Sequence, residues 1–211
     1  MSLRTIFHVR FSRFLKQIDL DLAKLARAER CARCDGVLHS ARYPRKLRGV
    51  PDAVAAQFTR RESLCCAREG CRGRTTPPSV VFQSRRLYFA ASMMLASAFA
   101  SGDRIHRAER LKAVFDVDVR TLRRWQEWWR EAFPESECFR AGAGRFSPPL
   151  STPDLPRSLL ARFAGEPRDR LAAALLFLAP TTTTSVPYER ALRWTENCPQ
   201  STPRDPSVRG Q

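Results

Sequence analysis

The seven cysteines include two closely spaced pairs that could hold a metal ion. Two residues separate Cys31 from Cys34, and four residues separate Cys66 from Cys71. Zinc takes four ligands in a tetrahedron, and thiolates two to four residues apart can reach one ion from a tight turn. Turn-forming glycines lie beside both pairs. The sequence therefore predicts a structural zinc site built from Cys31, Cys34, Cys66 and Cys71.

One neighbouring thiol and one histidine are alternatives to these ligands. Cys65 could replace Cys66, but Cys66 gives the usual four-residue gap, and alternation along a strand points the two side chains to opposite faces. His39 is a possible substitute ligand, and Cys138 and Cys198 are expected to be ordinary thiols. Four thiolates around one ion leave no open position for water, which indicates a scaffold and not a catalytic metal.

Residues 103–130 have the pattern of a helix-turn-helix. Apolar residues at helical spacing predict one helix over Asp103–Phe115 and another over Val119–Ala132. In the break between them, Asp116 stands where glycine is usual, and aspartate tolerates left-handed geometry better than most residues. Asp118 is placed to cap the second helix by accepting a hydrogen bond from a free amide in its first turn.

The two helices are expected to pack through one apolar face each. These faces consist of Ile105, Ala108, Leu111 and Phe115 in the first helix, and of Leu122, Trp125 and Trp129 in the second. The remaining face of the second helix carries Arg120, Thr121, Arg123, Arg124 and Glu127. In a helix-turn-helix, this second helix enters the major groove, where arginine either binds two acceptors of guanine or binds phosphate. We therefore expect these five residues to contact double-stranded DNA; a solvated face on a plain helical hairpin is the alternative.

The rest of the chain divides by composition into regions that would position these two features. The fold class expected is mainly α with a small β zinc ribbon, followed by the helix-turn-helix. Glycines and prolines break residues 31–82 into short elements, whereas Leu87–Ala100 reads as one apolar helix. The predicted regions are an amphipathic helix in 1–30, the zinc ribbon in 31–82, the helix-turn-helix region in 83–134, a linker with short helices in 135–180, and a disordered tail in 181–211.

The charge balance favours a polyanionic partner. Lys and Arg number 37 against 21 Asp and Glu, which gives a net charge of +16, and half of this surplus lies in the first fifty residues. Arg72, Arg74, Arg45 and Lys46 are expected to add phosphate contacts. No apolar run reaches the length of about 20 residues that spans a membrane, and the first thirty residues lack the pattern of a secretory signal. We therefore expect a cytoplasmic protein without membrane contact, with its cysteines reduced.

Three segments together resemble a known kind of module. They read CARC, SLCCAREGCRGRTTPPSVVF and FDVDVRTLRRWQEWW. In this order they resemble the zinc-ribbon plus helix-turn-helix modules at the front of bacterial insertion-sequence transposases, and small transposase-like proteins found beside mobile elements, over about residues 31–133. The resemblance implies zinc at the four cysteines, DNA contact by Arg120–Trp129, and recognition of mobile-element ends or a promoter. A recombinase or transposase is then a further candidate partner.

The chain departs from a complete transposase in its second half. Strand transfer by that class needs three carboxylates on a separate fold that hold two metal ions. Only 77 residues follow Pro134, and their carboxylates lack the apolar strands of such a fold. We therefore expect a DNA-binding protein that is not an enzyme, either an accessory protein or a remnant. The alternatives are a subunit whose catalytic carboxylates lie on another chain, and an interaction module that binds protein through the ribbon and Trp128. The sequence leaves open the DNA site, the oligomeric state and the role of residues 141–211.

Overall fold

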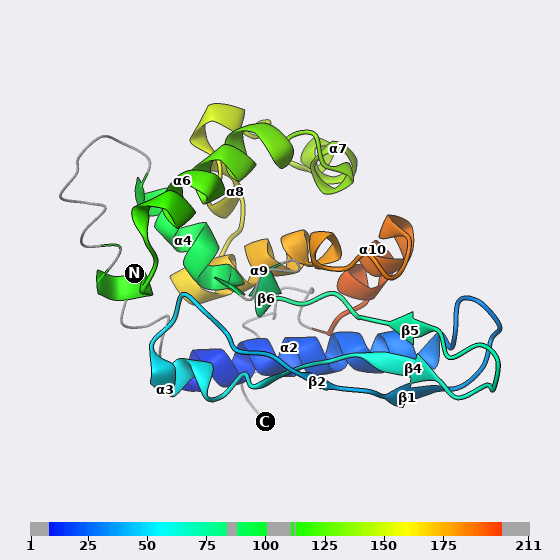
Figure 1. Cartoon of the computed structure of the whole chain (residues 1–211). Coiled ribbons are helices and arrows are strands. Elements are labelled where there is room, and N and C mark those ends of the chain that lie inside the picture. Colours follow the sequence, from blue (N-terminus) through cyan, green and yellow to red (C-terminus); the bar gives the residue numbers. More distant parts are fainter. Residues whose placement is uncertain (1–8, 84–87, 101–110, 112, 200–211) are drawn as a thin grey trace, which may run out of the picture.

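The structure is a computed structural model that describes residues 9–83, 88–100, 111 and 113–199. It is mainly helical with a small β content, as the sequence predicts, and its strands form three small antiparallel sheets. Figure 1 shows the long helix α2 (Val9–Ala28) along one side of the molecule with the short strands beside it. Most of the later helices lie on the other side of the strands, whereas the last described helix packs against α2 (Figure 1). In the described part of the chain, no helix has the length and apolar character needed to cross a bilayer.

Helix α2 is the amphipathic helix expected within residues 1–30. Leu15, Ile18 and Leu22 recur at spacings of three and four and are buried, which places them on one face. The end of α2 is joined to helix α10 (Tyr188–Glu196) by ion pairs from Arg190 and Arg193 to Glu29, at 3.6 and 3.7 Å. The first and last helices described therefore pack together.

Residues 31–83 form short strands around a brief helix. β1, β4 and β5 make a three-stranded sheet in the order β1-β4-β5, in which Leu38 pairs with Cys66 and Cys65 with Arg74. The elements are β1 (Leu38–Ser40), β2 (Tyr43–Pro44), α3 (Asp52–Ala55), β3 (Arg60–Arg61), β4 (Leu64–Cys66), β5 (Arg74–Thr75) and β6 (Phe82–Gln83). The hairpin of β2 and β3, with α3 between them, accounts for the long gap between the two cysteine pairs.

A buried carboxylate joins α2 to the strands. Asp19 Oδ1 accepts from the Val80 amide at 2.7 Å, and Asp19 Oδ2 accepts from the Ser79 hydroxyl at 2.6 Å. Burial raises the pKa of Asp19 to about 7, although both hydrogen bonds act in the opposite direction. Thr182 lies far along the chain and accepts two hydrogen bonds in this cluster. Its hydroxyl accepts one from the Ser79 amide at 2.8 Å, and its carbonyl accepts one from Arg61 Nη2 at 2.7 Å. This cluster links four stretches of sequence inside the molecule.

The apolar helix expected over Leu87–Ala100 begins later than predicted. Tyr88 and Phe89 form β7, which pairs with β6, and α4 covers Ala90–Ala100. The aromatic pair has strand propensity, and Phe89 fits opposite Phe82 on the buried face of this sheet. α4 packs against β6, β7, α6 and α9 (Pro167–Leu178), so it lies at the centre of the helical half.

The second helix of the expected helix-turn-helix is present as α6 (Val119–Glu127), which continues through a π-helical turn at Trp128–Ala132. It ends before Pro134, which cannot continue a helix. Most of the expected first helix, Asp103–Phe115, lies outside the described residues; Leu111 and residues 113–115 are helical, and Leu111 and Phe115 are buried.

The C-terminal region is more ordered than its composition suggests. Residues 135–180 contain the short helices α7 (Glu137–Gly142), α8 (Arg157–Leu160) and α9. The prediction of a disordered tail over 181–211 is wrong for residues 181–199, which include the end of a 3-10 turn (Ala179–Thr182) and α10. Proline opens both elements, where its missing amide is harmless. Ala191 and Trp194 lie on the buried face of α10. Residues 200–211 lie outside the described part of the chain.

Candidate metal centre and basic surface

Four cysteine sulfurs meet at one point of the structure. The Sγ atoms of Cys31, Cys34, Cys66 and Cys71 all lie within 4.8 Å of one another. The Sγ atoms of Cys31 and Cys71 are 3.7 Å apart, and those of Cys34 and Cys66 are 3.5 Å apart. A tetrahedron with Zn–S bonds of about 2.3 Å has edges of about 3.8 Å. A disulfide would need about 2.0 Å, so the spacing fits four thiolates around one ion.

Each cysteine pair is held by its own tight turn. In the first, the Cys31 amide donates to the Gly36 carbonyl at 2.9 Å, and the Asp35 amide donates to the Cys31 carbonyl at 2.8 Å. In the second, the Cys66 amide donates to the Gly73 carbonyl at 2.9 Å. Asp35, with φ of 56°, adopts the left-handed conformation that closes the first turn. Backbone hydrogen bonds therefore help to fix the shape of both cysteine turns.

Gly36 lies against the sulfurs themselves. A Cβ atom at this position would stand 2.8 Å from Cys66 Sγ and 3.3 Å from Cys34 Sγ. No side chain fits there without moving a ligand atom. The glycine that follows the first pair is thus required by the close approach of the backbone to the second pair.

Two of the four thiols differ in their readiness to ionise. Hydrogen bonding, chiefly from the backbone amide of Arg33, lowers the pKa of Cys31 to about 7. Burial raises the pKa of Cys66 to about 12. A bound dication stabilises thiolate directly, so it would supply the charge that the buried Cys66 needs in order to ionise.

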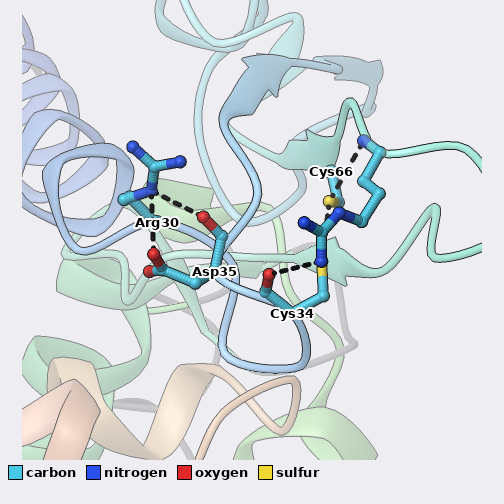
Figure 2. Close-up of polar contacts among 5 residues, drawn as sticks. Arg30, Cys34, Asp35 and Cys66 are labelled. Carbon is cyan, nitrogen blue, oxygen red and sulfur yellow. Dashed lines mark hydrogen bonds and ion pairs between the residues drawn. The ribbon is translucent and has the colours of Figure 1, made fainter.

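Arginine side chains brace the turns from outside. Arg30 Nε donates to the Asp35 carbonyl at 2.6 Å and lies 3.4 Å from Asp35 Oδ2, as Figure 2 shows beside Cys34 and Cys66. Arg68 Nη1 donates to the Cys34 carbonyl at 3.1 Å, and the Arg68 amide donates to Cys66 Sγ at 3.4 Å. Arg68 therefore connects the two turns, a role that the sequence did not indicate.

The other thiols and His39 lie outside this cluster. Cys66 is fully buried and Cys65 is partly exposed, on opposite faces of β4 as alternation predicts. His39, which pairs with Cys65 across the sheet, is exposed and is not among the grouped ligands. Cys138 and Cys198 are buried elsewhere, and burial raises the pKa of Cys138 to about 12.

Helix α6 starts at the cap that the sequence predicts. The Thr121 amide donates to Asp118 Oδ1 at 2.7 Å, and this bond lowers the pKa of Asp118. Asp116, with φ of 48°, takes the left-handed conformation in the turn, and Val117 is buried behind it. The turn geometry proposed for the helix-turn-helix is therefore present between Phe115 and Val119.

The outward face of α6 matches the prediction at four of five positions. Arg120, Arg123, Arg124 and Glu127 are exposed, whereas Leu122 and Trp125 are buried. Thr121 is the correction: only 1% of it is exposed, so it cannot contact a groove directly. Its hydroxyl bonds Asp118 Oδ2 at 3.2 Å and lies 3.5 Å from the Tyr88 hydroxyl, which turns it inward.

A second basic segment reaches the base of α6 from residues 45–48. The backbone of Arg48 pairs with that of Tyr88 in an isolated β-bridge, in which the Arg48 carbonyl accepts a hydrogen bond from the Phe89 amide at 3.0 Å. The ring of Tyr88 packs edge-on against Trp125 of α6, with centroids 5.2 Å apart. Gly49 lies against Val117 in the turn. Arg45 and Lys46 precede Arg48 in this segment and are exposed; the Arg45 guanidinium lies over the Tyr43 ring, 4.3 Å from its centroid.

Arg72 and Arg74 belong to a different end of the molecule. Both are exposed and flank Gly73, where a Cβ atom would stand 3.5 Å from Cys71 Sγ and 3.6 Å from Cys31 Sγ. Figure 1 places the turn before β5 beyond the end of α2, on the far side of α9 from α6. The nine residues expected to contact DNA therefore do not form one surface.

In comparisons with models of protein families, with curated proteins and with solved structures, nothing matched the chain.

Proposed function

We propose that this protein binds double-stranded DNA through α6 and that a zinc ion at the four cysteines stabilises its ribbon. The cysteine cluster has the ligand number, ligand type and spacing of a closed structural zinc site. With every position taken by sulfur, the ion would have a structural role. The proposal therefore assigns no catalytic step to this chain.

The face of α6 supports the DNA assignment by its composition and its attachment. Leu122 and Trp125 fix the helix to the core, which leaves Arg120, Arg123 and Arg124 in solvent. Arginine binds phosphate with two parallel hydrogen bonds and can also bind the O6 and N7 atoms of guanine. A capped helix displaying three arginines after a tight turn is suited to the major groove.

The observation that carries the proposal is the position of Arg48. The bridge to Tyr88 and the contact of Gly49 with Val117 set Arg48 near the start of α6, although the two segments are far apart in sequence. An exposed arginine of a distant segment thus lies near the exposed arginines of α6. Such convergence raises the local positive potential, which attracts a polyanion.

The zinc assignment is tested by metal analysis of the purified protein. One zinc per chain is expected, and the variant Cys34→Ser should lose it. Cys65→Ser, which removes the neighbouring thiol outside the cluster, should retain it. Protein that contains no transition metal and keeps its structure in chelator would contradict this half of the proposal.

The DNA assignment is tested by titrating a labelled duplex at several salt concentrations. If about six phosphates are neutralised, affinity should fall on the order of a thousandfold between about 50 and 200 mM salt. Arg120→Ala with Arg123→Ala should weaken binding and reduce the salt slope by about two. The same loss of charge at Arg168→Ala with Arg170→Ala, in the first turns of α9, is the matched control. A flat salt response would contradict DNA binding.

The biological setting follows from the sequence resemblance alone. We propose that the DNA recognised is the end of a mobile element or a promoter, with a transposase or recombinase as a further partner. Duplexes carrying such ends can be compared with unrelated duplexes in the same titration.

A further inference from the structure

The side chain of Arg124 is held differently from the other arginines of α6. Arg124 Nη2 donates to the Thr121 hydroxyl at 3.0 Å, and that hydroxyl in turn bonds Asp118 Oδ2. Within the described part of the chain, no hydrogen bond or ion pair restrains the side chains of Arg120 and Arg123. Arg124 is thus the ordered cation of this face.

The anchor that holds Arg124 is itself rigid. Thr121 is buried, and its hydroxyl lies 3.5 Å from the hydroxyl of Tyr88, whose ring packs on Trp125. The Thr121 amide is tied to Asp118 as well. Three elements, β7, the turn and α6, therefore fix the position of one hydroxyl group.

This anchoring also sets where the guanidinium lies. Because Arg124 reaches back one turn to Thr121, its head group lies toward the start of α6, at the end that a recognition helix inserts into the groove. The guanidinium has five N–H donors, and the bond to Thr121 uses one of them. The donors left over can pair with two acceptors side by side.

We infer that Arg124 reads a guanine in the major groove and that Thr121 is its positioning residue, whereas Arg120 and Arg123 bind phosphate. This inference rests on the proposed DNA binding. Guanine presents O6 and N7 as adjacent acceptors. Two parallel N–H groups of the planar guanidinium, which form a fork, match these acceptors, and an ammonium group does not. Holding the fork in place before binding reduces the conformational entropy lost on contact. A mobile arginine is adequate for phosphate, which lines the whole groove.

The test is selection of bound sequences from a pool of duplexes with a randomised central segment, using the full-length protein. The wild type should enrich sites with a guanine at a fixed position. Arg124→Lys keeps the charge but lacks the fork, so preference for that guanine should fall about ten- to hundredfold. Arg168→Lys, the same change at an exposed arginine of α9 outside the proposed DNA-binding face, is the matched control and should leave the preference unchanged.

Thr121 is tested by a pair of variants that differ in one hydroxyl. Thr121→Val keeps the shape and should relax the same guanine position, whereas Thr121→Ser keeps the hydroxyl and should restore it. The salt slope should be the same in both, because the number of phosphate contacts is unchanged. Thermal melting of each variant separates this effect from unfolding.

The outcomes distinguish the inference from the proposal beneath it. Salt-dependent binding with no enriched guanine, or with a guanine preference that survives Arg124→Lys, overturns the inference and leaves DNA binding standing. If no duplex binds with salt-dependent affinity, the proposed function fails, and the inference fails with it.

Discussion

The cysteine end and the α6 end of this protein are both built around a tight turn, but different forces hold them. At the cysteine end, four sulfurs face one another and the surrounding Arg33, Arg68 and Arg72 are exposed. At the α6 end, Trp125 and Trp129 are buried among other aromatic rings. With the proposed metal bound, the cysteine end depends on a ligand and the α6 end on packing, so either end should be able to unfold while the other keeps its structure.

Removal of a sulfur ligand should give the largest effect. Structural zinc contributes on the order of 10 kcal/mol to folding of small modules. Cys66→Ser should abolish metal binding and expose the amides of residues 31–37 and 66–73 to hydrogen exchange. Protection of α6 should persist, because its contacts lie elsewhere. Cys65→Ser is the control, and loss of α6 protection in Cys66→Ser would refute the independence of the two ends.

The converse experiment truncates the aromatic anchor of α6. Trp125→Ala removes a side chain that is 4% exposed and packs on Tyr88. The free energy of unfolding should fall by about 3–5 kcal/mol, from lost burial and the cavity left behind. DNA affinity should fall as well, while one metal per chain remains bound. Metal loss in this variant would show that the ends are coupled.

Asp19, whose carboxylate joins α2 to Ser79 and Val80, should make the stability of the fold depend on pH. Its pKa in the folded state is about 7, against an ordinary value of 3.8, so the folded state holds the proton more tightly. Its contribution is fully present below about pH 4 and is lost as pH rises through about 7, by on the order of 4 kcal/mol. Chemical denaturation between pH 5 and pH 8 should show this slope in the wild type. Asp19→Asn, which cannot ionise, should remove that component.

Crowding the sulfurs should give a smaller effect confined to one end. Gly36→Ala would place Cβ 2.8 Å from Cys66 Sγ, so the turns must separate slightly. Overpacking of this kind costs about 1–3 kcal/mol, and a competitive chelator titration should report it as weaker metal binding. Gly144→Ala, where no atom lies within 4 Å of the added Cβ, should bind metal as the wild type does.

Removal of the α6 cap should give the smallest effect, confined to the other end. Asp118→Ala leaves the Thr121 amide without its acceptor at the start of the helix. Stability should fall by about 1 kcal/mol, measured by thermal melting. Metal affinity should not change. Asp118→Asn keeps an acceptor oxygen and should recover most of the loss.

The features that sequence predicts best here are the local ones. The cysteine spacing, the choice of Cys66 over Cys65, the left-handed Asp116 and the Asp118 cap all depend on a few consecutive residues, and each is present. Helix α2 also follows from its regular apolar stripe. These features need no knowledge of what lies across the molecule.

The features that were missed depend on partners distant in sequence. Thr121 was expected on the exposed face of α6, but it is buried, with its hydroxyl 3.5 Å from that of Tyr88, which lies thirty-three residues earlier in the sequence. Arg48 owes its place to Tyr88 in the same way. The position of Asp19 on the apolar stripe of α2 indicates from sequence that its carboxylate is buried. Its partners Ser79 and Val80, about sixty residues later, cannot be predicted from the sequence of that helix.

The two bonds that Thr182 forms with Ser79 and Arg61 have a consequence for how the polypeptide can be divided. A backbone break in the exposed stretch near Gly144 would divide the chain into two pieces. The two hydrogen bonds of Thr182 and the ion pair between α10 and the end of α2 would both join one piece to the other. Removing the C-terminal piece would therefore uncover the end of α2 that contacts α10 and would take away the Thr182 atoms that accept from the Ser79 amide and from Arg61.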